Sequence, residues 1–293
     1  MARKINIKQE TMSIEEMHAK FMNYCYAKNL TDRTLKGYQD LLKAYTYDAI
    51  TIENIEDYIC KLKAKGNNVN SVNCYLRGMR VFAYFCMQRK YIPEFKIHLL
   101  KTNKEVKAIY TNEEIRILVA KPKTNSWCQW RNWAAINFLI GTGARVSTCI
   151  NIRIKDVDFT NNKVLYIHNK NGKQQYVPLS PKLKEVLQKY LSLWEHTDND
   201  WLFPSQDNVQ LTPSGFKQLV RKYNLAHGVE KTSVHLFRHT FATNYILNGG
   251  SPFLLKEILG HSDMGMVNHY LQLVDKNLQE NIQQFSMLDR LYD

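Results

Sequence analysis

The stretch 235–243, His-Leu-Phe-Arg-His-Thr-Phe-Ala-Thr, lies inside a helix that the apolar pattern predicts for 233–247. His235 and Arg238 are three residues apart, so a helix places both on one face. A guanidinium can clamp two phosphate oxygens, and an imidazole can donate to or accept from the same group. His239 follows directly, and we expect it to point elsewhere on the helix. Taken alone, the pair is equally consistent with an ordinary polar helix face.

Another arginine follows a glycine-containing turn upstream. The segment 141–145, Gly-Thr-Gly-Ala-Arg, lies where an apolar helix predicted for 130–140 ends and another helix begins. Glycines permit a tight turn, which presents Arg145 near a helix N-terminus, a natural site for an anion. By itself the segment is better explained as a helix–helix turn with a surface arginine.

A β-hairpin is predicted between these two basic segments. Short strands at 164–167 and 175–179 flank Asn-Lys-Asn-Gly-Lys at 169–173, and Asn-Gly is a strong hairpin signal. Lys170 lies at the tip, where a mobile side chain can protonate a leaving oxygen. Lys173 is the alternative for that role, and a solvated turn lysine is the ordinary explanation of both.

Two further candidates lie toward the C-terminus. Leu-Gly-His at 259–261 ends a predicted helix at its glycine and exposes His261. Tyr270 follows nine residues later within a helical pattern. A single tyrosine among 17 is most often a packing residue.

The charge of the chain favours a polyanionic partner. Its 40 Lys and Arg exceed its 27 Asp and Glu, which gives a formal net charge of +13. The excess is shared, with +7 in residues 1–105 and +6 in the remainder. Basic side chains replace the counterions on phosphates, so the excess of positive charge favours nucleic acid as the partner. Positive charge in both halves is typical of a protein that contacts a duplex from two sides.

Several classes of protein are disfavoured. No run of about 18 apolar residues exists, and the N-terminus lacks a signal-peptide core, so we expect no membrane span and a cytoplasmic location. The six cysteines are scattered without a Cys-x-x-Cys pair, which predicts buried free thiols and no zinc site. We therefore expect no cofactor and no metal.

The chain is predicted to be mainly α-helical with a small β-hairpin or sheet. Residues 1–105 are predicted to form a helical bundle, beginning with a capping box at Ser13 and with further helices from about Thr31, Thr51 and Ser71. The polar stretch 101–107 is typical of a linker. A second capping box at Thr111 starts a mixed α/β domain, assigned to 106–293, which ends in an apolar helical tail.

These segments together resemble the tyrosine recombinase (phage integrase) family, in its simple Xer-like two-domain form. The resemblance covers the C-terminal half and rests on segments in a fixed order: Thr-Gly-x-Arg ending at Arg145, Lys170 seven residues before Val-Pro-Leu, His-x-x-Arg at 235–238, Leu-Gly-His ending at His261, and Tyr270. The helical N-terminal part is similar to the family's SAM-like core-binding domain in pattern and length.

The resemblance implies that Tyr270 is a nucleophile that attacks a DNA phosphate. The product is a 3′-phosphotyrosine with a released 5′-hydroxyl, which conserves the phosphoester energy without ATP or metal. Arg145 and Arg238 would neutralise the charge that builds on the phosphorus. The resemblance also implies that Lys170 donates a proton to the 5′-oxygen. It implies that His235 assists proton transfer with the tyrosine. His261 would hydrogen-bond the phosphate or the attacking oxygen.

One position departs from the family's pattern. Many relatives carry an acidic residue three positions after the first arginine, where it supports the site. Thr148 occupies that position here. The departure puts the support of Arg145 in doubt, but not the chemistry itself.

The expected function is site-specific DNA recombination through a Holliday junction, for integration or excision of a mobile element or resolution of multimers. The expected partners are double-stranded DNA and a homo-tetramer on two DNA sites, with or without accessory proteins. A non-catalytic DNA-binding accessory protein of the same fold and a type IB topoisomerase-like DNA-relaxing enzyme are the alternatives. The tail at 271–293 packs either on its own domain or on a neighbouring protomer, and the sequence leaves both open.

Overall fold

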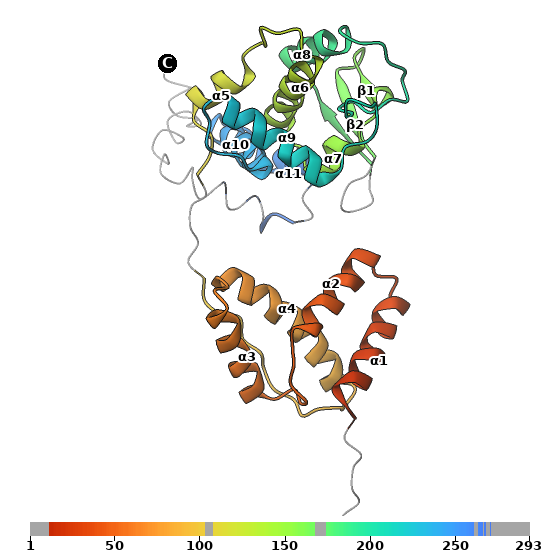
Figure 1. The fold of residues 1–293 in the computed structure, drawn as a ribbon, viewed down its shortest axis with the longest axis vertical. Coiled ribbons are helices and arrows are strands. Elements are labelled where there is room, and N and C mark those ends of the chain that lie inside the picture. The colour runs from red at the N-terminus through yellow and green to blue at the C-terminus, as the bar shows by residue number, and fades with distance from the viewer. Residues whose placement is uncertain are drawn as a thin grey trace, which may run out of the picture. The chain divides into compact units, whose positions relative to one another are not determined.

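The structure is a computed structural model that describes residues 12–102, 108–167, 174–260, 263–265, 267 and 270. Helices make up most of the described chain, together with one three-stranded antiparallel sheet (Figure 1). This confirms the predicted fold class. The chain divides into two compact units, residues 1–106 and 107–293.

The first unit is a helical bundle built around its longest helix. Its helices are α1 (Ile14–Ala27), α2 (Asp32–Lys43), α3 (Ile52–Ala64) and α4 (Val69–Gln88). Ser13 forms the predicted capping box, and Thr31 and Thr51 cap the next two helices where the sequence predicted their starts. α4 packs against the other three helices, and Leu76 and Met79 on its inner face are fully buried.

The second unit combines helices with the sheet. Its elements are α5 (Asn112–Val119), α6 (Trp127–Thr142), α7 (Val146–Asn151), the 3-10 turn η1 (Ile154–Asp156), β1 (Val157–Asp158), β2 (Lys163–Tyr166), β3 (Gln175–Pro178), α8 (Pro181–Leu191), α9 (Pro213–Ala226), α10 (Val234–Leu247) and α11 (Pro252–Leu259). Thr111 forms the second predicted capping box, at the start of α5.

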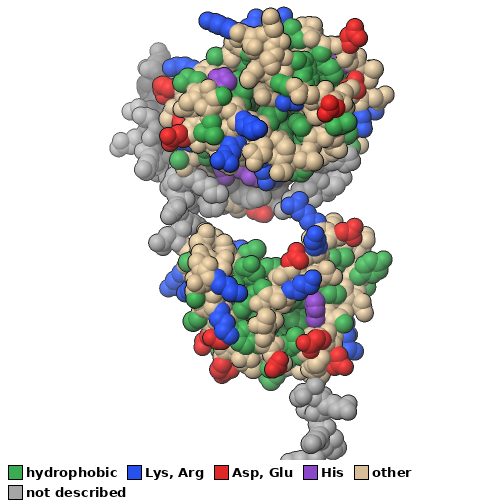
Figure 2. Space-filling view, in the orientation of Figure 1, with side chains coloured by type: hydrophobic (Ala, Val, Ile, Leu, Met, Phe, Trp, Pro, Cys, Tyr) green, Lys and Arg blue, Asp and Glu red, His purple; other side chains and the backbone are tan. Residues whose placement is uncertain are grey.

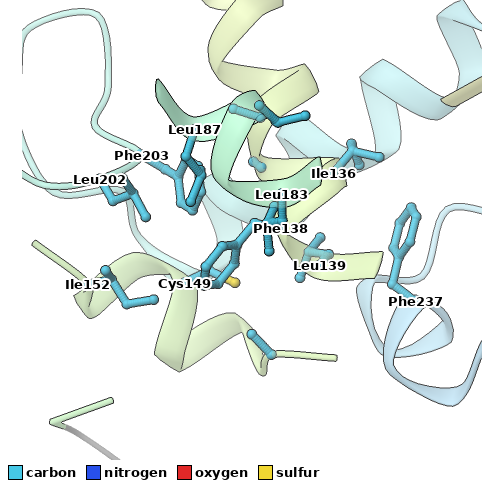
Figure 3. Close-up of a cluster of buried hydrophobic side chains, with 14 of the residues drawn as sticks. Ile136, Phe138, Leu139, Cys149, Ile152, Leu183, Leu187, Leu202, Phe203 and Phe237 are labelled. Carbon is cyan, nitrogen blue, oxygen red and sulfur yellow. The ribbon is translucent and has the colours of Figure 1, made fainter. Parts of the chain in front are cut away.

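Helix α6 is the centre of this unit. It packs against α5, α8, α9 and α10, and Ile136, Phe138 and Leu139 on it are fully buried. Figure 3 shows Phe138 and Leu139 beside Leu183 of α8, and these residues belong to one buried cluster with Ile136 and Leu187. A helix that is apolar on most sides must be enclosed by other elements. The enclosure fixes the C-terminal end of α6, from which the candidate site begins.

The three tryptophans of α6 take part in packing. Trp133 is 5% exposed, and Trp127 and Trp130 are half-buried against the same core. The Trp127 ring lies edge-on to Trp194, with 5.6 Å between the ring centroids.

The sheet has the order β1-β2-β3, with β2 paired to both neighbours. Val164 lies opposite Val177, and Tyr166 lies opposite Gln175. Val164, Tyr166 and Val177 are buried on the core side. The two predicted strands are therefore confirmed, whereas β1 is too short to leave a period-2 pattern. The predicted hairpin tip at 169–173 lies outside the described residues.

The cysteines are all free, but burial differs among them. Cys25, Cys86 and Cys149 are buried, as expected. Cys60 and Cys74 are exposed, so the expectation of buried thiols is wrong for these two, which lie on the outer faces of α3 and α4. In the described part of the chain, no helix is both long enough and apolar enough to cross a membrane.

The left-handed glycine at the end of α6 generates a stability prediction. Gly143 has φ of +62°, and an added Cβ would lie 2.7 Å from Phe241 Cδ1 and 2.9 Å from Leu259 Cδ2. Gly143→Ala therefore combines left-handed strain, about 1–2 kcal/mol, with overpacking of about 1–3 kcal/mol. The control is Gly249→Ala, where φ is +77° and nothing lies within 4 Å.

We expect Gly143→Ala to lower the free energy of unfolding by clearly more than Gly249→Ala does. The measurement is urea denaturation followed by tryptophan fluorescence. All 5 tryptophans lie between residues 127 and 201, so the signal reports the second unit. Equal losses for the two variants would contradict the close approach at Gly143.

Candidate active site

The turn after α6 positions the first candidate arginine. Gly143 ends the helix in the left-handed conformation, and its N–H bonds the carbonyl of Leu139. The chain then becomes extended at Arg145, the N-cap of α7, whose side chain makes no capping hydrogen bond. The Arg145 guanidinium is consequently half-buried and directed away from its own helix, toward α11.

The second candidate arginine approaches the same place from α10. Arg238 is 8% exposed and donates from Nη1 to the Gly143 carbonyl at 2.9 Å and from Nη2 to the Leu259 carbonyl at 2.8 Å. Arg145 donates to the Leu259 carbonyl at 3.1 Å and to the Gly260 carbonyl at 3.4 Å. The two guanidinium groups therefore meet at one oxygen at the end of α11.

The C-terminal end of α11 supports Arg145 in place of the acidic residue that Thr148 replaces. Thr148 is buried on α7 and offers no carboxylate. Arg145 instead bonds the free carbonyls of a helix C-terminus, which carries a partial negative charge. Its support comes from the backbone of α11 rather than from the side chain three positions along the chain.

Burial and proximity change the acidity of both guanidinium groups. Burial, and then the positive charge of Arg145, lower the pKa of Arg238 to about 10. Burial also lowers the pKa of Arg145. Both groups remain cationic at neutral pH, and each raises the electrostatic cost of the other. An anion placed between them relieves that cost, which is the property of a phosphate site.

A glutamine that the sequence analysis did not single out holds the end of α11 from the other side. Gln175, the first residue of β3, donates from Nε2 to the Ile258 carbonyl at 2.8 Å and also to the Glu257 carbonyl. Gly260 follows with φ of +60°, and a Cβ there would lie 2.8 Å from Gln175 Oε1. β3 is thus tied to the helix end that bonds both arginines.

The candidate nucleophile is buried beside this cluster. Tyr270 is 7% exposed and packs with Ile246 of α10 and with Leu255 and Leu259 of α11. Burial raises the pKa of the Tyr270 hydroxyl, and the positive charge of Arg238 opposes that rise. The hydroxyl therefore lies within electrostatic reach of Arg238, and its proton is held more tightly than in water.

The Tyr270 hydroxyl is hydrogen-bonded to the histidine that the sequence analysis set aside. The Nδ1 atom of His239 lies 2.9 Å from Tyr270 Oη. The expectation that His239 points elsewhere is therefore wrong. It lies four residues after His235, a spacing that also shares a helix face, and this signal was available in the sequence.

The remaining predicted residues are placed only in part. His235 is exposed in the first turn of α10, in a surface pocket that Lys217 and Arg221 of α9 also line. Lys170 and His261 lie outside the described residues. On the face shown in Figure 2, Lys and Arg side chains occur on both units, interspersed with Asp and Glu.

Known proteins share the sequence pattern of this chain. Residues 100–277 match the family described as the phage integrase family. Tyrosine recombinase XerD of Oceanobacillus iheyensis is 27% identical over 279 residues, which cover 88% of this chain and 93% of the relative.

Two solved structures share the fold. The Tn1549 transposon integrase in complex with transposon right end DNA has a TM-score of 0.74 and 22% identity, covering 88% of this chain and 94% of that one. A lambda integrase tetramer bound to a Holliday junction has a TM-score of 0.71 and 16% identity, covering 89% and 78%. Since the matched region spans more than half of the sequence and includes Arg145, Arg238 and Tyr270, this chain belongs to the phage integrase family.

Proposed function

We propose that this protein is a tyrosine-type site-specific DNA recombinase, which cuts and rejoins double-stranded DNA through a 3′-phosphotyrosine intermediate. The observation that carries the proposal is the grouping of a buried tyrosine hydroxyl with Arg238, which shares the Leu259 carbonyl with Arg145. A protein that only binds DNA has no use for a buried phenol beside two phosphate-binding cations. The family membership supports the same conclusion.

The chemistry follows from the charges at the site. Tyr270 Oη attacks the scissile phosphorus, and a phosphotyrosine bond replaces the bond to the 5′-oxygen. Negative charge builds on the nonbridging oxygens during the attack, and Arg145 and Arg238 stabilise it. Because one phosphodiester is exchanged for another, the reverse attack by a 5′-hydroxyl rejoins the strand without ATP.

Three other residues complete the proposal. Lys170 would give a proton to the leaving 5′-oxygen, with Lys173 as the alternative donor. His261 would hydrogen-bond the phosphate or the attacking oxygen, and the resemblance implies that His235, in the first turn of α10, assists proton transfer with the Tyr270 hydroxyl. The neighbouring Lys217 and Arg221 supply positive charge for flanking phosphates.

The proposed assembly is four protomers on two DNA sites, joined through a Holliday junction. Two basic units, 1–105 and 106–293, suit a protein that contacts both sides of a duplex. The lambda integrase structure with the same fold is itself a tetramer on such a junction. The biological task is integration or excision of a mobile element or resolution of multimers, with or without accessory proteins, in the cytoplasm.

The nucleophile is tested by trapping the intermediate. DNA that becomes covalently attached to the protein in its host is sequenced to define the site, and a nicked suicide substrate is built from that sequence. We expect Tyr270→Phe to form no covalent adduct. Tyr166→Phe is the control, because Tyr166 is also buried near Arg238 and should retain the activity. An adduct with Tyr270→Phe would disprove the assignment.

The two arginines are tested by replacing each with lysine. Lysine keeps the charge but loses the forked donors, so Arg145→Lys and Arg238→Lys should each slow adduct formation by about 10²–10³-fold. Arg131→Lys is a matched control, because Arg131 is also 8% exposed but bonds the Pro204 carbonyl elsewhere in the unit. Rates are compared per folded molecule. Equal losses in all three variants would indicate a general effect of burial.

The products distinguish recombination from the alternatives. A supercoiled plasmid that carries two copies of the site is incubated with the protein in EDTA. We expect recombinant circles, because the arginines rather than a metal supply the positive charge. Relaxation without recombinants would instead favour a type IB topoisomerase, and cleavage only after magnesium is added would favour a metal-dependent nuclease. Binding without cleavage would favour an accessory protein.

A further inference from the structure

The hydroxyl of Tyr270 is hydrogen-bonded to the imidazole ring of His239. The Nδ1–Oη distance is 2.9 Å, and the two ring centroids are 5.9 Å apart at 51°. His239 is half-buried on α10, directly after Arg238, and Tyr270 is 7% exposed. A rigid helix therefore holds an imidazole nitrogen against the oxygen that the proposed reaction uses.

The attack on phosphorus needs a group that takes the phenolic proton. Burial raises the pKa of Tyr270 above that of a free phenol, so the ionised form is scarce at neutral pH. Arg238 favours the phenolate but is itself charged and has only donors to offer. A neutral imidazole accepts a proton near pH 7, which is the property required of the group on this hydroxyl.

We propose that His239 is a catalytic residue that takes the proton of Tyr270 during attack and returns it during strand rejoining. As the Oη–P bond forms and the bond from phosphorus to the 5′-oxygen breaks, the phenolic proton passes to Nδ1 of His239. The 5′-oxygen takes a separate proton from the acid proposed at Lys170. On rejoining, the imidazolium protonates the departing phenolate.

The surrounding charges make this transfer dependent on DNA. The hydroxyl that His239 bonds already lies within electrostatic reach of Arg238, so an imidazolium formed there would add a second positive charge to this place in the protein alone. A phosphodiester bound by Arg145 and Arg238 brings negative charge, and the transition state gains one more when the proton leaves the phenol. The proton transfer is therefore favoured when the scissile phosphate is in place. The resemblance implies that His235, in the first turn of the same helix, assists proton transfer with the tyrosine. We assign that role to His239 instead, because the structure places the His239 ring nitrogen at the Tyr270 hydroxyl.

The inference rests on Tyr270 being the nucleophile, and two variants separate proton transfer from simple positioning. Asparagine offers an oxygen close to the place of Nδ1 but takes up no proton, whereas alanine offers neither. We expect His239→Asn and His239→Ala to slow adduct formation on the suicide substrate by a similar factor, about 10²–10⁴. Non-covalent DNA binding should be unchanged.

A matched control and a rescue complete the experiment. His227→Asn replaces a histidine of the same unit whose Nδ1 bonds the Tyr223 carbonyl at 2.8 Å, and it should react at the native rate. Free imidazole should restore part of the rate to His239→Ala and none to Tyr270→Phe. Native activity of His239→Asn, or absence of rescue, would overturn proton transfer by His239. Activity of Tyr270→Phe would instead overturn the proposed function.

Should the His239 variants fail to fold, the contact itself is tested in the native chain. The ¹⁵N resonances of the histidine rings are recorded for the native protein and for Tyr270→Phe. We expect the Nδ1 resonance of His239 to shift when its hydrogen-bond donor is removed. An unchanged resonance would contradict the hydrogen bond and with it the inference.

Discussion

The carbonyl oxygen of Leu259 is the point on which the candidate site depends. It accepts a hydrogen bond from Arg145, which comes from the turn after α6, and another from Arg238, which comes from α10. The chain thereby uses the free C-terminal end of α11 to bring two like charges together. Without that acceptor, the repulsion between two half-buried or buried cations would favour separation of the side chains.

A helix end differs from a carboxylate as a partner for arginine. The end carries about half of an elementary charge, shared among several carbonyls, so it orients the guanidinium groups without neutralising them. Full positive charge is then left for a phosphate. Thr148 in place of an acidic side chain is consistent with this balance, since a carboxylate would compete with the phosphate for the same donors.

Local features of this site could be predicted from the sequence, and contacts between distant segments could not. The caps at Ser13 and Thr111 and the turn at Gly143 depend on neighbouring residues, so their patterns are visible in the chain. Gln175 reaches carbonyls more than 80 residues away, and nothing in a four-residue strand indicates that contact. His239 had a visible spacing, but only its contact with Tyr270, 31 residues on, distinguishes it from a polar surface residue.

Leu259 also couples the proposed nucleophile, Tyr270, to the arginines. Its side chain is 2% exposed and packs in the small cluster that contains Tyr270, while its carbonyl holds both guanidinium groups. The same side chain lies against Gly143, where an added Cβ would approach it to 2.9 Å. A displacement of the end of α11 therefore moves the tyrosine and the phosphate-binding groups together. The alignment of the proposed nucleophile with a phosphate bound at the arginines would in this way depend on the packing of Leu259, and Gln175 links the same helix end to β3.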